Sequence, residues 1–472
     1  MVSLFTNATL MKNTLYLFLL FSFLFSCKSI PYHQTQAIAI DNLASKKYDL
    51  ALAEMNKNKE LNQQYNLMLK QVEEGRVLFL QGNYSAANKL FIEAELKVED
   101  FNSYFYRDIS GGKIKVFDFN NEYYSGKVTT EKPKSMGLDW REAPKSSGYS
   151  YTGSLKTASR TEYICLDMEK PLLNFYVGLS AAYGNKDNFL VEAKRLEKIG
   201  ENLDRRAYPI NPEVPYARNP FTNLAAGLFY EAAGEPNDAL IAYEKAWQCY
   251  QDYYSQPYYG MVAPEQLKLD ILRINKKLGF TDKYEQWSKQ FSLSLKQDEL
   301  YSRSLVLIIE EGLIPFKNPT GNFQIQNKPN SNSHNLPTTS SVRSFDDQTP
   351  TFPEYLPAYS VQYYPYTNRV KSIQVDQTKY EPQLINNLEF MMVYGYGKRN
   401  FRERVYPVST GNGFDLRHWQ TLPNKIYYVR IPLKKDESTL KFSYTVGRQI
   451  RNVEYTLDLN KQMQIRHIYV CE

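Results

Sequence analysis

The sequence predicts an α+β, multidomain fold in which N-terminal α-helical repeats precede a C-terminal antiparallel β-sandwich. Three observations lead to this prediction. Small and aromatic residues recur at helical offsets in the first 300 residues, apolar residues alternate after about residue 350, and 43% of the 472 residues are hydrophobic. A chain of this length and apolar content is expected to form two or three domains with sizeable cores.

A short apolar run near the N-terminus stops at a cysteine. Lys12 precedes LYLFLLFSFLF, which is too short to span a bilayer as a helix but has the length of the apolar region of a secretory signal. The residues LFSC that end at Cys27 resemble a bacterial lipobox, in which the cysteine receives a diacylglycerol and becomes the new N-terminus. We therefore expect a signal peptide over residues 1–26, with Met11 as an alternative start, and lipidation of Cys27.

Several acyl chains, such as palmitate, would anchor the chain firmly, whereas one chain alone binds a membrane only marginally. No acidic cluster follows Cys27, so we expect anchoring to the outer membrane on its periplasmic face. Three further cysteines, Cys165, Cys249 and Cys471, cannot all pair with one another in an oxidising compartment. Buried thiols are the expected state, and a pair between Cys165 and Cys249 is the alternative.

Two segments share the spacing of a tetratricopeptide repeat. GRVLFLQGNYSAANKLFIEAE, from residue 75, and GLFYEAAGEPNDALIAYEKAW, from residue 227, place small and aromatic residues at the same offsets. In a helical hairpin such glycines allow close helix contact or end the first helix. Weaker copies occur at YDLALAEM and around Gly178, and a further helix is expected at PEQLKLDILRINKKLG. The repeat-defining residues are Gly75, Gly82, Ala87, Gly227, Gly234 and Ala239.

We expect tetratricopeptide-like repeats to fill a helical domain over residues 27–300, with an irregular insert at about 110–160. Helical repeats of this kind bind peptide segments or partner proteins on their concave face. Standard hairpin geometry directs five side chains that way, and packing against neighbouring helices is the alternative. These partner-binding candidates are Arg76, Phe79, Phe221, Leu228 and Glu231.

The composition changes twice in the second half. A short apolar run predicts a connecting strand within residues 301–317, and residues 318–351 have the Asn, Pro, Ser and Thr content of a flexible linker. Within residues 352–472, LKFSYTV and the segment after Gly447 alternate with period two, which predicts a hairpin. KIYYVRIPL, QMQIRHIYV and LEFMMVYGYG add strands, so we expect an antiparallel β-sandwich of about seven strands.

The sequence carries no strong signature of catalysis, cofactor binding or metal binding. HExxH, GxSxG and phosphate-binding glycine loops are absent, and the four histidines are scattered. Ser110 and Lys113 spell SxxK without its partner motifs, and Asp415 beside His418 lacks a nucleophile at a fixed spacing, so we expect that pair to orient a turn. Removal of residues 1–26 leaves a net charge of +5, which does not favour nucleic acid as a partner.

Four blocks occur in the order NPFTNLAAGLFYEAAGEPNDALIAYEKAW, PEQLKLDILRINKKLG, SLVLIIEEG and DLRHWQTLPNKIYYVRIPL. The last carries a motif of Asp415, Arg417, Trp419 and Pro423. In these blocks the chain resembles an uncharacterised family of bacterial lipoproteins with tetratricopeptide-type helical repeats and a C-terminal β domain. The resemblance implies little about activity, although genes of this family are often found near lipoproteins that activate penicillin-binding proteins.

These observations favour a non-enzymatic envelope lipoprotein that acts as a protein-binding scaffold and is linked to cell-wall assembly. Its expected partners are an envelope protein or peptide, the membrane through the lipid anchor, and cell-wall glycan. Two alternatives come from other classes: an envelope hydrolase with a dispersed active site, or a glycan-binding module that uses surface tyrosines and Trp419. We expect Trp419 in the core instead, because it leads into an apolar strand.

Overall fold

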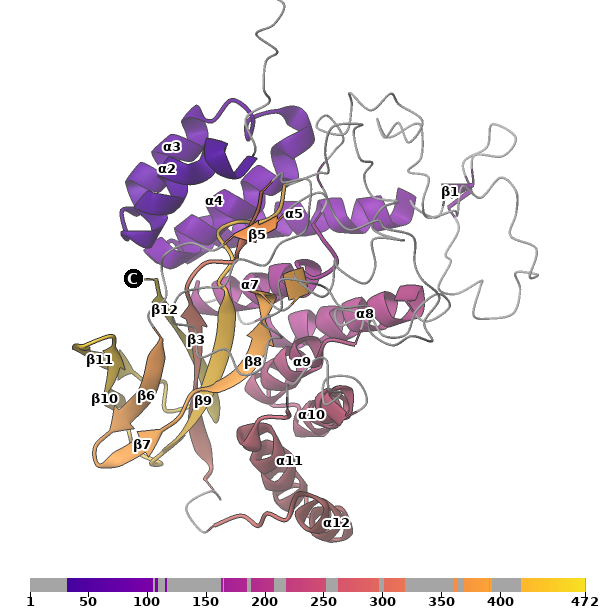
Figure 1. The fold of residues 1–472 in the computed structure, drawn as a ribbon. Coiled ribbons are helices and arrows are strands. Elements are labelled where there is room, and N and C mark those ends of the chain that lie inside the picture. Colours follow the sequence, from indigo (N-terminus) through magenta and orange to yellow (C-terminus); the bar gives the residue numbers. More distant parts are fainter. Residues whose placement is uncertain are drawn as a thin grey trace, which may run out of the picture.

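The fold is mixed α+β, with the helices early in the chain and most strands after residue 303 (Figure 1). The computed structural model describes residues 32–104, 107–108, 115–116, 163, 165–184, 188–207, 218–251, 262–296, 301–318, 360–362, 369–389, 391–392 and 417–471. The expected signal peptide with Cys27, nearly all of the insert and nearly all of the linker lie outside these residues. None of the helices described is long and apolar enough to cross a membrane.

Consecutive helices pack in antiparallel pairs that lie side by side, and together we call them the helical layer (Figure 1). Loops of two to five residues join the helices of a pair, so each helix turns back along its predecessor. The pairs are α2 (Tyr32–Ala44) with α3 (Tyr48–Lys57), α4 (Leu67–Gln81) with α5 (Tyr84–Tyr104), α7 (Lys170–Tyr183) with α8 (Phe189–Ala207), α9 (Pro220–Ala232) with α10 (Pro236–Cys249), and α11 (Glu265–Lys277) with α12 (Thr281–Phe291).

The predicted small residues sit where two helices of a pair touch or where a helix ends. A methyl group on Gly75 would lie 2.8 Å from the Phe91 ring, and one on Gly227 would lie 2.4 Å from the Tyr243 ring. Gly82 and Gly234 follow α4 and α9 with φ of +89° and +85°, which favours glycine. The sequence spacing thus specifies close contact between the paired helices.

Two four-stranded sheets follow. The inner sheet has the order β12 (Met463–Val470), β3 (Arg303–Glu311), β9 (Lys425–Leu433) and β8 (Gln383–Asn387). The outer sheet has the order β11 (Gln449–Thr456), β10 (Thr439–Val446), β6 (Val370–Val375) and β7 (Thr378–Tyr380). Short two-stranded pairs are formed by β1 (Arg107–Asp108) with β2 (Lys115–Val116), and by β4 (Phe316–Asn318) with β5 (Ser360–Gln362).

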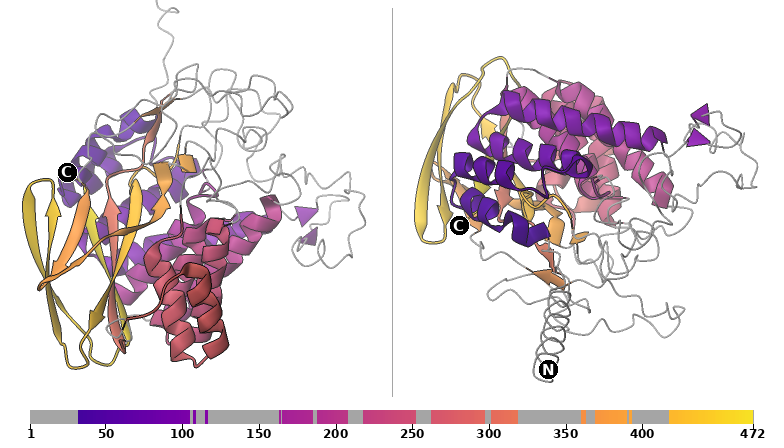
Figure 2. Two further views of the ribbon diagram at one scale, coloured as in Figure 1. Left: turned by 60° about the horizontal axis from the view of Figure 1, so that its bottom comes forward. Right: turned by 90° about the horizontal axis from the view of Figure 1, so that it is seen from above.

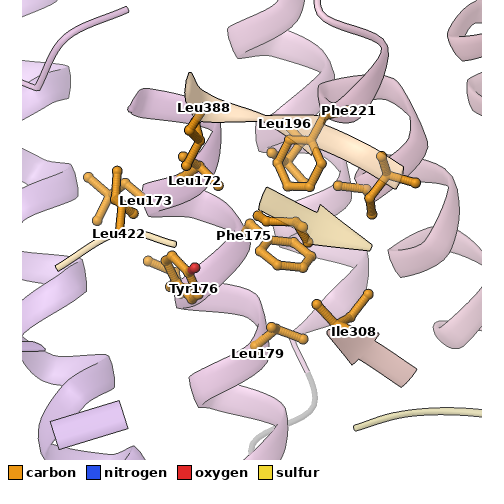
Figure 3. Close-up of a cluster of buried hydrophobic side chains, with 14 of the residues drawn as sticks. Leu172, Leu173, Phe175, Tyr176, Leu179, Leu196, Phe221, Ile308, Leu388 and Leu422 are labelled. Carbon is orange, nitrogen blue, oxygen red and sulfur yellow. The ribbon is translucent and has the colours of Figure 1, made fainter. Parts of the chain in front are cut away.

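The inner sheet lies between the helical layer and the outer sheet (Figure 2). Side chains of β3 alternate between its faces: Val306 and Ile308 join the core shared with the helices, while Leu305, Leu307 and Ile309 join the core shared with the outer sheet. Burial on both faces explains why this strand reads as a continuous apolar run. Figure 3 shows Ile308 near Leu179 and Phe175 of α7.

Three strand predictions need correction. The expected connecting strand is β3, which lies inside the inner sheet between β9 and β12. It pairs in parallel with β12, so the strands are not all antiparallel; a long chain separates the two, as parallel pairing requires. LEFMMVYGYG does not begin a strand: Leu388 and Glu389 are helical, and the strand β8 ends one residue earlier.

The predicted hairpin after residue 438 is confirmed. Strands β10 and β11 pair antiparallel along their whole length, and Gly447 between them has φ of +58°. KIYYVRIPL and QMQIRHIYV form β9 and β12, as expected. Cys165 and Cys471 are buried and Cys249 is half-buried, and these three cysteines form no disulfide with one another, so the pair between Cys165 and Cys249 does not form.

Candidate functional site at the helix–sheet interface

The five partner-binding candidates lie where the helical layer meets the inner sheet or a neighbouring helix. Arg76, Phe79, Phe221 and Leu228 are buried, and the Glu231 side chain is 8% exposed. The expectation that they face a separate partner needs correction, because the chain's own inner sheet covers this side of the helices. Arg76 and Phe79 contact β3 and β12, and Glu231 contacts β9.

Arg76 of α4 forms a buried ion pair with Glu310 of β3. The other oxygen of Glu310 accepts a hydrogen bond from the Tyr176 hydroxyl at 2.5 Å, and His467 Nε2 lies 2.7 Å from the Glu310 carboxylate. The guanidinium carbon of Arg76 also lies 4.5 Å from the centre of the Tyr176 ring. Burial alone would raise the pKa of Glu310, but the charges of Arg76 and His467 outweigh it and lower the pKa to about 2.

A second buried network joins the end of α9 to α11 and β9. Glu231 lies 2.7 Å from Arg273 of α11 and 2.8 Å from Arg430 of β9, and Arg430 Nε lies 2.8 Å from Asp270. The Tyr243 hydroxyl donates a hydrogen bond to Glu231 at 3.0 Å. Burial would raise the pKa of Glu231, but the two guanidinium groups lower it to about 2.

The second network balances its charges. Two carboxylates, Glu231 and Asp270, face two guanidinium groups, Arg273 and Arg430, so the charges within this network compensate one another. Removal of one partner of a buried pair costs about 3–5 kcal/mol, because the other charge stays buried without compensation. The networks therefore depend on the presence of both layers.

The motif from Arg417 to Pro423 docks the β part into the helices. Glu169, just before α7, accepts a hydrogen bond from the Trp419 backbone nitrogen at 2.8 Å. Glu73 of α4 accepts from the next two backbone nitrogens, those of Gln420 and Thr421, at 2.7 and 3.0 Å. Burial raises the pKa of Glu73 to about 7, although these hydrogen bonds favour the charged form.

Side chains of the same motif are enclosed. Trp419 has no exposed surface, packs near Phe91 and Tyr176, and donates from Nε1 to Thr421 Oγ1 at 2.8 Å, which confirms its prediction as a core residue. Arg417 donates to Asn66 Oδ1 at 2.6 Å, and Pro423 is buried. The motif thus has a docking role in this structure.

Of the acid–base pair considered from the sequence, only His418 belongs to the described residues. His418 is buried, with Nε2 3.1 Å from the Pro315 carbonyl oxygen. Asp415, the SxxK stretch from Ser110 to Lys113, and the lipidation candidate Cys27 lie outside the described residues. Within those residues, no cluster of three His, Cys, Asp or Glu side chains is placed to hold a metal ion.

The residues that sequence reasoning missed are the charges on the other side of the interface. Glu310 ends the apolar run SLVLIIE, and Arg430 stands inside IYYVRIPL. Arg430 has apolar neighbours on both sides, and Glu310 is the first of two glutamates that follow an apolar run. A charge at either kind of position in a buried strand indicates a buried counter-charge, because an unpaired buried charge is strongly disfavoured. That signal was present, but it does not say which residue is the partner.

The outer sheet has an open depression of about 430 Å³ on its exposed face. Cross-strand register places Ser443 of β10 directly opposite Asn452 of β11 and Gln374 of β6, so an amide, a hydroxyl and a second amide form one row. Lys441 and Glu454 lie beside this row and form an exposed ion pair at 3.4 Å. Such a surface offers hydrogen bonds to a polar ligand.

Comparison of the chain with models of known protein families and with curated proteins finds no match.

Proposed function

We propose that the protein is a lipoprotein of the bacterial cell envelope that acts as a non-enzymatic scaffold. In this proposal residues 1–26 are a cleaved signal peptide, lipid on Cys27 anchors the chain to the periplasmic face of the outer membrane, and the chain contributes to cell-wall assembly. The helix pairs belong to the tetratricopeptide class, and the two packed sheets act as a β-sandwich. The lipobox-like LFSC and the short apolar run support the anchor.

The observation that carries the scaffold role is the use of charge at the helix–sheet interface. Glu310, Glu231 and Glu73 are carboxylates enclosed at this interface with shifted pKa values, and each is hydrogen-bonded or ion-paired to the opposite layer. This arrangement fixes the layers against each other. A rigid body of this kind suits the presentation of binding surfaces. Because the inner sheet covers the inner helix face, partner binding is assigned to the other surfaces.

Crosslinking of the whole lipidated protein in the envelope tests the scaffold role. We expect recovery of a specific envelope protein by the wild-type chain, and loss of that partner in Cys27→Ser, which should accumulate as an unacylated precursor. Mass spectrometry of the N-terminal peptide checks the acylation. Turnover of peptidoglycan or of a peptide by the purified protein, abolished by a single substitution that spares folding, would contradict the proposal.

A glycan-binding module is the second candidate, and it is favoured by the polar row on the outer sheet. Calorimetric titration with soluble peptidoglycan fragments should give binding that is weakened in Asn452→Ala and Ser443→Ala. Thr456→Ala on the same strand is the matched control. If all three variants bind the fragments as tightly as the wild type does, this surface is not the glycan site.

A further inference from the structure

The proposed lipid anchor lies very close to the folded part of the chain. Tyr32 begins α2, is buried, and its hydroxyl lies 3.4 Å from Glu73 of α4, so the fold is fixed from this residue onward. An extended chain covers at most about 3.6 Å per residue, so the five steps from Cys27 to Tyr32 span about 18 Å or less. A helix with its side chains is about 10–12 Å across. A lipid on Cys27 therefore keeps the N-terminal end of α2 within about two helix diameters of the bilayer surface.

The helix nearest the anchor exposes an apolar side chain on its outer side. Gln36 faces α4, because its amide donates to the Tyr32 hydroxyl that contacts Glu73. Ile38 follows two residues later, a rotation of about 200° around the helix, and so points away from α4. It is 65% exposed. Leu50 of α3, in the same helix pair, is 54% exposed.

The charge of this helix pair favours apolar contact rather than electrostatic attraction. Acidic and basic side chains of residues 32–62 balance one another, so the pair is neither drawn to nor repelled by anionic headgroups. Exposed apolar side chains at a membrane surface gain free energy in proportion to the apolar area that they bury. The balanced charges are Asp41, Asp49, Glu54 and Glu60 against Lys46, Lys47, Lys57 and Lys59.

We propose that the α2–α3 pair lies against the lipid bilayer, with Ile38 and Leu50 as its contact residues. The inference depends on the proposed lipidation of Cys27 and adds an orientation to it. Because the helix pairs follow one another along the helical layer, α11–α12 lies at the end opposite α2–α3 (Figure 1). The molecule thus stands end-on, with the helix–sheet interface running away from the membrane and α12 farthest from it.

Photo-crosslinking of the full-length acylated protein in vesicles tests this orientation. A photoreactive amino acid replaces Ile38, Leu50, or one of two matched controls on later helices: Leu96 of α5, 56% exposed, and Ile241 of α10, 49% exposed. All four positions are exposed, so folding is retained. We expect lipid adducts at positions 38 and 50 and none at positions 96 and 241. The same pattern is expected in vesicles of phosphatidylcholine alone and in vesicles that also contain phosphatidylglycerol.

Three results would overturn the inference: equal lipid adducts at all four positions, adducts to protein instead of lipid at 38 and 50, or adducts that require anionic lipid. The acyl state of Cys27 is read by mass spectrometry in the same samples. An unmodified Cys27 would contradict the proposed function itself. An acylated Cys27 without the predicted adduct pattern would contradict only the membrane contact of α2–α3.

Discussion

Glu310 is a charged residue that the fold uses inside its core. Its carboxylate forms an ion pair with Arg76 of α4 and lies beside His467 of β12, so this side chain of β3 links its own strand to two other elements. Both Arg76 and Glu310 are fully buried. A buried pair of this kind stabilises the fold only while both members are present.

The lowered pKa of Glu310 predicts a pH-dependent effect of Glu310→Gln. Folding lowers the pKa from 4.5 to about 2, so the charged carboxylate is the form that folding favours. Its contribution is complete above pH 4.5 and is lost as the pH falls towards about 2. The pKa difference between the unfolded and folded states corresponds to about 3 kcal/mol of unfolding free energy, since one pKa unit is about 1.4 kcal/mol.

Urea unfolding of the wild type and Glu310→Gln between pH 7 and pH 3 measures this effect. The difference in unfolding free energy between the wild type and Glu310→Gln should be constant near neutral pH and should decrease below pH 4.5. Glu454→Gln, at the exposed ion pair with Lys441, serves as the control and should change stability by less than about 1 kcal/mol. A difference that increases on acidification would show that the Glu310 carboxylate is not stabilised in its charged form.

Trp419 provides a second residue-scale prediction. It is completely buried between Phe91 and Tyr176, so Trp419→Ala should leave a cavity and lower the unfolding free energy by about 3–5 kcal/mol. Trp287 of α12 is only half-buried, so Trp287→Ala is the matched control and should lower the unfolding free energy by less. Unchanged unfolding of Trp419→Ala together with lost glycan binding would assign the residue to ligand binding instead.

At the scale of the element, the helix pairs depend on glycines at their crossing points. Alanine usually stabilises a helix relative to glycine by about 1 kcal/mol. At Gly227 the added methyl would lie 2.4 Å from the Tyr243 ring, and this ring is held by the hydrogen bond from its hydroxyl to Glu231. Close contact therefore outweighs helix propensity at this position.

Gly227→Ala should accordingly lower the melting temperature, with a loss of about 1–3 kcal/mol. Gly200→Ala in α8 is the matched control, because its added methyl would meet Thr222 at 3.4 Å, an ordinary contact distance. That variant should be neutral or stabilised. Circular dichroism on heating measures both, and equal melting of the two variants would mean that the α9–α10 contact tolerates a methyl group.

At the scale of the whole molecule, the helical layer is not expected to fold without the inner sheet. A chain that ends at residue 298 lacks Glu310 and Arg430, so Arg76 and the group of Glu231, Asp270 and Arg273 lose their partners across the interface. The fragment would also expose the apolar face that α7 presents to β3 (Figure 3). We expect rapid proteolysis of this fragment and protection when residues 299–472 are co-expressed.

Limited proteolysis compares the fragment alone, the co-expressed halves and the whole chain. Resistance of the isolated fragment equal to that of the whole chain would show that the helices form an independent domain. This outcome would restore the boundary near residue 300 that the sequence suggested. It would also make the inner helix face accessible to a partner.

The sequence by itself determined the elements whose residues are close together in the chain. The spacing of Gly75 and Gly82 predicted a helix pair, and the alternation before Gly447 predicted the β10–β11 hairpin, because helix contact and strand pairing follow short, regular periods. The burial of Trp419 also followed from its local context. These features need no knowledge of distant segments.

Only the tertiary structure decided what lies against the inner face of the helices. Arg76 is separated from Glu310 by 234 residues, and Glu231 from Arg430 by 199 residues. No period links such positions, and a charge within or at the end of a buried apolar strand indicates that it has a partner without identifying it. The same holds for β3, whose apolar residues fit either a connection or a buried strand. It is a buried strand because the helical layer covers one of its faces and the outer sheet covers the other.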